Sequence, residues 1–326
     1  MNNDKKYIKT SPLISICCVS YNHEEFCKKA VESILNQDYQ NIEIIIVDDG
    51  SSDETLNILS DIKKHSQKPL KILSQANTGN VPANFNKAIR NSSGELLMFL
   101  SLDDELKPKS LDLLVKNLLS SKDYQLVIPK NIEIIDKNGG YVDTEQTNLF
   151  KRNLKCFKNQ DFLDADNKDA GSFYIQGCIF KKSLIENCGS FDEDMLGDDI
   201  VLRIKIFRYM IQNPKMKFKL IENATCRYRK HDNNIHLRKN RQCDTIYQVS
   251  QRYFDGKLPK ILNRWIDDTV RDLIEKNNLK LALRIILLDK KNKKKLKLAI
   301  KYLPTILKKL LKKTDKNNSD VECINY

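Results

Sequence analysis

The chain contains 326 residues, of which 40% are hydrophobic and 30% are charged. This composition supports a sizeable core and excludes disordered and fibrous classes, and the length predicts one large domain or two smaller ones. No run of eighteen apolar residues occurs, which excludes a helix that crosses a membrane unaided. The N-terminal residues show no signal-peptide pattern, and the nine cysteines form no C-x-x-C pair. We therefore expect reduced cysteines and a cytoplasmic protein.

The net charge of +13 is concentrated near the C-terminus. Residues 290–316 contain twelve lysines and a single acidic residue, Asp315. The rest of the chain is therefore close to neutral. Aromatic residues are almost missing from this lysine-rich segment, so the sequence does not favour a nucleic-acid partner.

In the first part of the chain, predicted strands alternate with predicted helices. Apolar runs short enough for buried strands are separated by segments with helical periodicity. The predicted strands are residues 13–19, 42–47, 70–73 and 96–100, and the predicted helices are residues 23–37, a helix starting at Asp53, residues 82–90 and a helix starting at Pro108. Repeated units of this length predict an α/β fold with a parallel, doubly wound sheet flanked by helices.

After residue 120 the alternation becomes less regular. We expect strands at residues 126–135 and 141–142 around a turn at Asn138-Gly139-Gly140, because such turn residues favour a hairpin. Further strands are predicted at residues 174–180, 217–221 and 225–228, and a helix at residues 200–211. From about residue 246 the chain is predicted to be helical and basic. We therefore expect an α/β domain at residues 1–240 and a lysine-rich helical extension at residues 241–326.

Polar and acidic residues follow several predicted strands, at the positions where open α/β sheets bind ligands. Ser20 and Tyr21 follow the first strand, and Asp48 and Asp49 follow the second. Asp48 and Asp49 also precede a predicted helix, so they fit either a binding role or an acidic helix start. Tyr21 fits either packing or stacking on a nucleobase.

Two further acidic groups carry the strongest chemical signal. Asp103 and Asp104 come directly after a buried strand, where adjacent carboxylates repel each other unless a cation lies between them. Mg²⁺ or Mn²⁺ together with a diphosphate would meet that need, because hard cations bind one or two carboxylates plus phosphate oxygens. Asp198 and Asp199 precede the helix predicted from residue 200, as a general base or as a helix cap.

These motifs together resemble the family-two glycosyltransferases. The resemblance lies in ISICCVSYNHEEF…IEIIIVDDGSSDET, in NTGNVPANFNKAIRNSSGELLMFLSLDDELKP, in YIQGCIFKKSLIENCGSFDEDMLGDDIVLRI and in CRYRKHDNNIH. The four segments stand in the family's order and cover roughly residues 11–236. The resemblance implies the GT-A fold, with a Rossmann-like, mostly parallel sheet, and inverting transfer from a nucleotide-diphosphate sugar, with a uridine diphosphate donor favoured.

For the donor, the resemblance implies contacts from the ends of the first strands. Asp49, with Asp48 beside it, would hydrogen-bond the base, and Tyr21 would stack on that base. Ser20 and Asn77 would belong to the same donor-binding set.

For the metal and the chemistry, the resemblance assigns the later motifs. Asp103 would face the ribose, whereas Asp104 and His231 would hold the Mg²⁺ or Mn²⁺ ion that bridges the phosphates. Asp199 would be the catalytic base. Asp198 would lie beside that base, and Arg229 or Arg227 would neutralise the diphosphate. The alternatives are that His231 is only a surface histidine and that the two arginines lie on a solvated strand edge.

Two departures from the family pattern keep a second function open. Ser101 stands where many members carry Asp, and Asn84 stands where they carry Arg. A catalytically weak module that binds nucleotide sugars is therefore the alternative to an active transferase.

The lysine-rich extension suggests a partner of its own. Its leucines and isoleucines alternate with lysines, which is typical of a helix lying on an anionic membrane surface. We expect Pro304 to divide it into two helices. A protein held peripherally at the cytoplasmic face would meet a polyprenyl-linked saccharide acceptor there. The alternative is that the apolar face packs on the protein and the lysines are only solvated.

Overall fold

The structure is a computed structural model of the whole chain, and it describes residues 11–142, 158–169, 171–232, 234, 239–256, 260–276, 279–287 and 301–309. The chain divides into two compact units, Met1–Asn234 and Ile235–Tyr326. The division falls close to residue 240, where the sequence predicts the end of the first domain. Residues 150–157, a region that the sequence leaves without a predicted element, lie outside the described residues.

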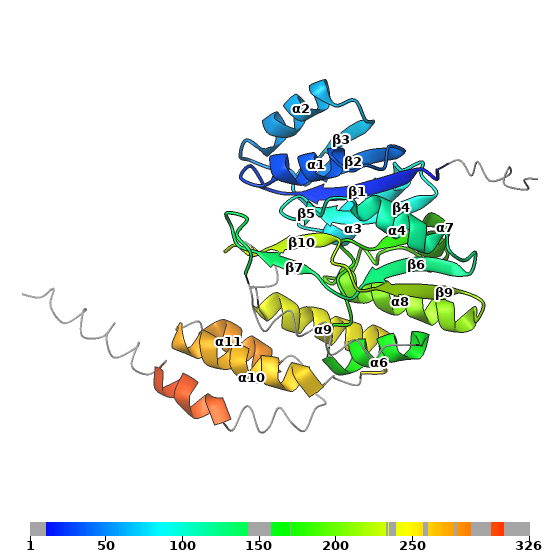
Figure 1. The fold of residues 1–326 in the computed structure, drawn as a ribbon. Helices are drawn as coiled ribbons and strands as arrows, with labels where there is room; N and C mark the ends of the chain where they lie inside the picture. The colour runs from blue at the N-terminus through cyan, green and yellow to red at the C-terminus, as the bar shows by residue number, and fades with distance from the viewer. Residues whose placement is uncertain are drawn as a thin grey trace, which may run out of the picture. The chain divides into compact units, whose positions relative to one another are not determined.

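The first unit is built on a seven-stranded sheet with the order β3-β2-β1-β4-β8-β6-β9 (Figure 1). The four strands β1 to β4 run parallel to one another, and β6 is parallel to β9, whereas β8 is antiparallel to both β4 and β6. This confirms the predicted α/β fold with a mostly parallel central sheet. The strands are β1 (Ile14–Ser20), β2 (Ile42–Asp48), β3 (Leu70–Ser74), β4 (Leu96–Ser101), β6 (Tyr124–Pro129), β8 (Ile179–Lys181) and β9 (Lys217–Ile221).

Helices connect and flank these strands, as expected when a chain returns to start the next parallel strand. Every residue of β1 is buried, and its side chains Ile14 and Ile16 lie in a core that also contains Ala30 and Ile34 of α1. The helix α3 starts at a cap in which Asn80 Oδ1 accepts a hydrogen bond from the Ala83 amide at 3.0 Å. The helices are α1 (Cys27–Leu35), α2 (Thr55–His65), α3 (Val81–Arg90), α4 (Ser110–Leu118), α6 (Asn159–Asp169), α7 (Lys182–Asn187) and α8 (Asp199–Gln212).

A second, three-stranded sheet has the order β5-β10-β7. Its strands are β5 (Glu105–Leu106), β7 (Glu133–Ile135) and β10 (Cys226–Arg229), and β10 is parallel to β7 and antiparallel to β5. Since β5 directly follows Asp103 and Asp104, this pairing brings β10 beside the acidic motif.

The middle of the chain departs from the sequence prediction in two places. The predicted strand at residues 126–135 is divided between β6 and β7, which belong to different sheets. The predicted strand at residues 174–180 is regular only from Ile179, because the preceding residues form a loop that touches β4 through a single bridge between Phe99 and Gln176. The predicted turn at Asn138-Gly139-Gly140 is present, and Asp136 N–H bonds the Gly140 carbonyl at 2.8 Å.

The second unit is helical, as predicted. It contains α9 (Lys239–Tyr253), α10 (Lys260–Glu275) and α11 (Leu279–Leu287), and residues 301–309 form a further helix. The helix continues across Pro304, so the expected break at this residue is wrong. Apolar side chains of three of these segments share a core made of Val270, Ile274, Leu279, Ala282, Ile286, Tyr302 and Ile306.

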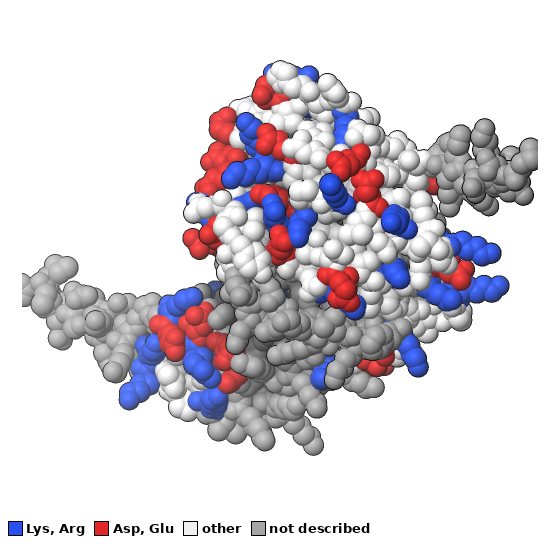
Figure 2. Space-filling model, in the orientation of Figure 1, with Lys and Arg blue, Asp and Glu red and all other residues white. Residues whose placement is uncertain are grey.

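Much of the predicted lysine-rich extension, residues 288–300 and 310–326, lies outside the described residues. Within the part that the structure describes, the helices are too short or too polar for any of them to span a bilayer. On the side of the first unit seen in Figure 2, lysines and arginines are interspersed with acidic residues. That face carries no broad basic patch.

Candidate active site

The carboxyl ends of three neighbouring strands bring the predicted donor-binding residues together. β1 lies between β2 and β4, with Ser20 opposite Asp48 and Val19 opposite Ser101. Because parallel strands end at the same edge of a sheet, residues that follow these three strands converge there. Tyr21 is 46% exposed at this edge, whereas the hydroxyl of Ser20 is buried and has no hydrogen-bond partner among the described residues.

Asp48 is fully buried at the end of β2 and organises the turn that follows. Its carboxylate accepts hydrogen bonds from the amide of Ser51 at 3.0 Å and from the Ser51 hydroxyl at 2.5 Å. The Asp48 side chain therefore fixes the loop that leads into α2.

Asp49 is tied to the loop that carries Asn77. Its carboxylate accepts four hydrogen bonds, from Gln75 Nε2 at 2.8 Å, Thr78 N and Oγ1 at 3.0 and 2.8 Å, and Gly79 N at 2.9 Å. Burial by itself would raise the pKa of Asp49, but these hydrogen bonds outweigh it and lower the pKa. Asp49 is thus an ionised anchor for this loop, a role that the sequence analysis did not anticipate.

The two loops also touch through Gly50. This glycine has φ of +74°, and a Cβ atom there would lie 2.6 Å from the Asn77 amide nitrogen. A side chain would have to displace backbone, so only glycine fits. The exposed Asn77 is therefore held next to Asp48 and Asp49.

Asp103 is paired with His231 in the structure. His231 Nε2 lies 3.1 Å from Asp103 Oδ2, and Asn234 Nδ2 donates to the same oxygen at 3.4 Å. The other oxygen, Asp103 Oδ1, is buried and lacks a hydrogen-bond partner among the described residues. Burial would raise the pKa of Asp103, but the hydrogen bond with His231 and the nearby His23 lower it to about 2.

Asp104 lies in a different environment from its neighbour. It is buried, and its Oδ1 accepts the backbone N–H of Arg229 at 2.9 Å. Burial and the adjacent charge of Asp103 raise its pKa well above the ordinary value. The two carboxylates therefore differ in their partners: Asp103 is paired with His231, whereas one oxygen of Asp104 is bonded to the Arg229 amide.

Arg229 does not present its guanidinium to a ligand. Its side chain is 1% exposed, donates to the carbonyl oxygens of Asp103, Asp136 and Lys137, and forms an ion pair with Glu105. The expectation that Arg229 neutralises the diphosphate is therefore revised, since its side-chain nitrogens are engaged with the acidic loop and with the turn after β7.

Asp198 and Asp199 stand at the start of α8. The Asp198 side chain makes no capping hydrogen bond, so a simple cap does not account for it. Asp199 Oδ2 lies 3.8 Å from a guanidinium nitrogen of Arg203, and Asp199 Oδ1 is buried without a partner among the described residues. Burial, together with the charge of Asp198, raises the pKa of Asp199 to about 8. Asp199 also acts on the pKa of Asp104, so the two acidic motifs belong to one electrostatic site.

Sequence reasoning missed His23. Its Nδ1 atom is buried without a partner among the described residues, and its backbone N–H bonds Thr55 Oγ1 at 2.8 Å. Burial lowers the pKa of His23, and the charges of Asp103 and His231 also act on it. A single histidine after a strand carries no sequence signal that separates it from a surface residue.

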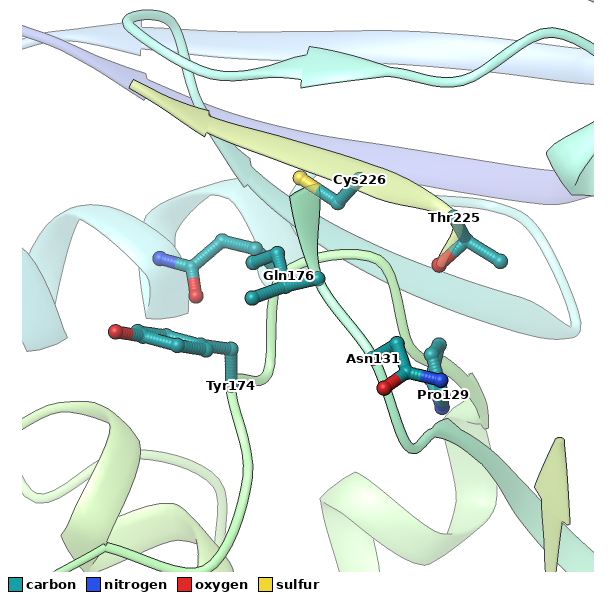
Figure 3. Close-up of a pocket in the computed structure, with 7 residues that line it drawn as sticks. Pro129, Asn131, Tyr174, Gln176, Thr225 and Cys226 are labelled. Carbon is teal, nitrogen blue, oxygen red and sulfur yellow. The ribbon is translucent and has the colours of Figure 1, made fainter. Parts of the chain in front are cut away.

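A small pocket whose lining includes Tyr174, Gln176 and Cys226 adjoins this site. Figure 3 shows the Gln176 side chain running alongside the Tyr174 ring, and the Oε1 atom of Gln176 is buried without a partner among the described residues. The Tyr174 ring stacks on Tyr228 with centroids 5.3 Å apart, and Asp199 and Asp104 contribute to its raised pKa of about 12, after burial. The pocket therefore lies next to both acidic motifs.

Comparison with known proteins identifies the family. The model of "Glycosyl transferase family 2" matches residues 15–186. A GalNAc(5)-diNAcBac-PP-undecaprenol beta-1,3-glucosyltransferase of Campylobacter jejuni is 30% identical over 197 residues, which cover 60% of this chain and 60% of that protein. A poly-beta-1,6-N-acetyl-D-glucosamine synthase of Staphylococcus epidermidis is 29% identical over 202 residues, 61% of this chain and 47% of that protein. The chain thus spans less than two thirds of these relatives.

Solved structures show the same fold at low sequence identity. S. aureus TarS 1-349 in complex with UDP-GlcNAc is 15% identical, with a TM-score of 0.51 and coverage of 83% of this chain and 82% of that chain. The mannosyltransferase PcManGT from Pyrobaculum calidifontis, in complex with GDP-Man and Mn²⁺, is 18% identical, with a TM-score of 0.54 and coverage of 92% and 81%. The fold, the order of the motifs and a family match over more than half of its length agree, and the chain belongs to glycosyl transferase family 2.

Proposed function

We propose that this protein is an inverting glycosyltransferase that moves a sugar from a nucleotide-diphosphate donor, a UDP-sugar, to a saccharide or polyprenyl-linked saccharide acceptor. One observation carries the proposal. Two buried carboxylate oxygens, Asp103 Oδ1 and Asp199 Oδ1, have no hydrogen-bond partner among the described residues. Buried polar atoms are normally satisfied, so orphaned ones in a family-two fold mark places that ligands complete.

The first orphaned oxygen fits a divalent cation. The described residues contain no cluster of three His, Cys, Asp or Glu side chains that could hold a metal by themselves. Mg²⁺ and Mn²⁺ need fewer protein ligands when a diphosphate supplies the rest. Asp103, ionised and paired with His231, is the better candidate ligand than Asp104, one oxygen of which already accepts the Arg229 amide. Asp104, the ligand that the sequence predicts, stays a candidate beside it.

The donor would bind along the edge formed by β1, β2 and β4. Tyr21 is exposed there and would stack on the base, while Asp48 and Asp49 shape the loops that surround it. Ser20 has an unpartnered hydroxyl at the same edge and would take part in donor binding. When bound, Mg²⁺ or Mn²⁺ supplies charge neutralisation for the leaving diphosphate.

The second orphaned oxygen would accept the acceptor's proton. No described residue donates a hydrogen bond to Asp199 Oδ1, and burial keeps Asp199 basic enough to remove a proton from a hydroxyl group. That hydroxyl oxygen would attack the anomeric carbon opposite the diphosphate, in one displacement that inverts the configuration. Asp198 would raise the basicity of Asp199 through its charge.

A thermal-shift screen tests the donor-binding part of the proposal. A ligand present at one hundred times its dissociation constant stabilises the folded state by about 2.7 kcal/mol. UDP-sugars should raise the melting temperature in the presence of Mn²⁺, and Asp103→Asn should remove the increase. If no nucleotide sugar stabilises the wild-type protein, the proposal is wrong.

The alternative function, a sugar-nucleotide-binding module with weak catalysis, would give the same thermal shift. It is favoured only by the departures at Ser101 and Asn84. In the structure Asn84 is buried, and its Oδ1 accepts a hydrogen bond from Gln75 Nε2 at 2.7 Å, which links it to the Asp49 network. Asn84 therefore has a structural role that does not depend on losing catalysis.

We also propose that the protein is peripheral at the cytoplasmic face of an anionic membrane, through its lysine-rich segment. The buried core of the second unit already uses Ala282, Ile286 and Ile306, so these side chains do not lie on a membrane. The attraction would come instead from lysines, each worth about 1 kcal/mol close to an anionic surface. A lipid-linked acceptor would be found at the same surface.

A further inference from the structure

The helix that carries the proposed base also carries a buried arginine. Arg203 follows Asp199 by one helical turn on α8 and is 4% exposed. An arginine is rarely buried without a partner, because removing its charge from water costs several kcal/mol. The partners of Arg203 therefore indicate which groups its positive charge stabilises.

Most of the hydrogen bonds of the Arg203 guanidinium go to a residue of a second helix, α6. Arg203 Nε lies 3.2 Å from both carboxylate oxygens of Asp166 on α6, and Arg203 NH2 lies 3.0 Å from Asp166 Oδ1. Arg203 NH1 donates to the Phe173 carbonyl at 2.7 Å. Asp166 is fully shielded from solvent in its side chain, and it also accepts a hydrogen bond from the Ser172 hydroxyl at 3.0 Å.

These contacts fix Arg203 at a particular separation from Asp199. The nearest atoms, Arg203 NH1 and Asp199 Oδ2, are 3.8 Å apart, which is close enough for strong charge attraction but too long for a hydrogen bond. α6 and α8 are held together by the stacked rings of Phe162 and Phe207, with centroids 4.3 Å apart. The guanidinium therefore cannot easily move towards Asp199.

We propose that Arg203, held by Asp166, is a positioning residue that balances the charge of Asp199 without hydrogen-bonding it, so that Asp199 keeps a free oxygen for the acceptor hydroxyl. This inference rests on the proposed function of Asp199 as the catalytic base. Asp166 keeps the donors of Arg203 away from the base. The charge of Arg203 limits how far desolvation raises the pKa of Asp199.

The other groups around Asp199 do not replace Arg203. Asp198 on the same helix and Asp166 on α6 both raise the pKa of Asp199, while Arg203 and the backbone N–H of Ile175 lower it. Other described titratable groups that interact with Asp199 include Tyr174 and Cys178 of the loop before β8, Asp104 before β5 and Tyr228 of β10. Arg203 is the only cation among these described groups.

The arrangement predicts opposite effects for its two partners. Arg203→Gln removes the favourable charge, so the pKa of Asp199 should rise. Asp166→Asn releases the guanidinium towards Asp199 and removes a negative charge, so the pKa of Asp199 should fall. The double variant Asp166→Asn with Arg203→Gln removes both charges, leaves a neutral pair that can hydrogen-bond, and should return the pKa towards the wild-type value.

The experiment is an NMR titration of the full chain labelled with ¹³C at the aspartate carboxyl groups. Asp199→Asn assigns the Asp199 signal by its disappearance. We expect displacements of about one pH unit upward for Arg203→Gln and downward for Asp166→Asn, a range typical of one nearby charge. Arg208→Gln, an exposed arginine on the same helix, is the matched control and should leave the midpoint in place. Midpoints that stay fixed, or that move the same way in both single variants, would overturn the proposal.

A second readout connects the arrangement to turnover. The pH profile of UDP release from UDP-GlcNAc with Mn²⁺ should move with the NMR midpoint in each variant, whereas a purely structural role would lower the rate without moving the profile. NMR midpoints that move while the profile stays fixed would contradict a role in positioning the base. A wild-type protein that releases no UDP from any nucleotide sugar would count against the proposed function, and the titration would still show whether Arg203 and Asp166 act on Asp199. Circular dichroism shows whether each single variant folds. If one does not, the charge-balanced double variant takes its place, and its NMR midpoint for Asp199 should stay near the wild-type value. Loss of the Asp199 titration in the double variant would overturn the proposal.

Discussion

His231 Nε2 lies 3.1 Å from Asp103 Oδ2, although the two residues are 128 positions apart in the chain. The contact exists because β10 pairs with β5, the short strand that follows the acidic motif. Phe26 lies against the His231 ring with centroids 4.8 Å apart, which helps to hold the imidazole in place. The pair therefore connects the segment after β4 with the segment after β10.

This pairing predicts how the two neighbouring aspartates differ in metal binding. Asp103→Asn and His231→Ala should each weaken Mn²⁺-dependent UDP binding by about tenfold or more, since both would remove a proposed ligand. Asp104→Asn should have the smaller effect, because an amide oxygen can still accept the Arg229 N–H. Calorimetric titration of UDP with and without Mn²⁺ measures the difference. A larger loss for Asp104→Asn than for Asp103→Asn would restore the sequence-based assignment.

The raised pKa of Asp199 predicts a pH dependence. A general base works in its deprotonated form, so kcat/KM should rise with pH until the pKa of about 8 is passed, and then level off. Asp198→Asn removes a negative charge that raises this pKa, so the rise should occur at lower pH. Initial rates between pH 6 and 9.5 provide the profile. A flat profile in the wild-type protein is incompatible with Asp199 as the base.

Arg229 should contribute strongly to stability and Arg227 should not. Arg229→Met would remove one of the two arginine partners of Glu105 and leave several carbonyl groups without a donor, and breaking a buried ion pair in this way costs about 3–5 kcal/mol. Arg227, two residues earlier on β10, pairs with Glu105 and Glu133, but its side chain is 37% exposed. Arg227→Met should therefore cost at most about 1 kcal/mol. Urea denaturation of both variants measures the free energy of unfolding. Equal losses of stability would contradict the larger contribution of Arg229 that its burial implies.

The lysine-rich segment should bind anionic vesicles in a salt-dependent way. Replacing the six lysines between residues 290 and 297 by glutamine removes charges that would each contribute about 1 kcal/mol near the surface. Sedimentation with vesicles rich in phosphatidylserine should show binding of the wild-type protein that weakens with added salt. Neutral phosphatidylcholine vesicles are the control. Equal sedimentation of the wild-type and glutamine variants would argue against a membrane role for these lysines.

The central part of the fold could be predicted because its signals are local. β1, β2 and β4 are short apolar runs buried in the sheet, and their order in the sheet places Ser20, Asp48 and Asp103 at one edge. The helix at Asp199 was likewise visible from its periodicity. Family motifs then added chemical roles that the pattern alone left open.

The division of roles within the site could not be predicted, since it depends on contacts between distant segments. The sequence predicts Arg229 on the diphosphate, with a solvated strand edge as the alternative, but its partners in the structure lie 92 to 126 positions earlier. Asp103 and Asp104 are equivalent in a sequence motif, and only the position of β10 gives one of them the Arg229 amide and the other His231. Asp166 and Arg203 carry no motif at all, and they meet only when α6 packs on α8.

The most direct test of the proposed function is sugar transfer by the purified wild-type protein and its Asp199→Asn variant. With Mn²⁺, a nucleotide sugar selected by thermal shift and a lipid-linked saccharide, the wild-type protein should form a glycosylated product of inverted configuration. Asp199→Asn should bind the donor with unchanged affinity but turn over about 10²–10⁴-fold more slowly. Donor binding by the wild-type protein without any transfer or hydrolysis, or equal rates in the two proteins, would contradict the account and favour a sugar-nucleotide-binding module.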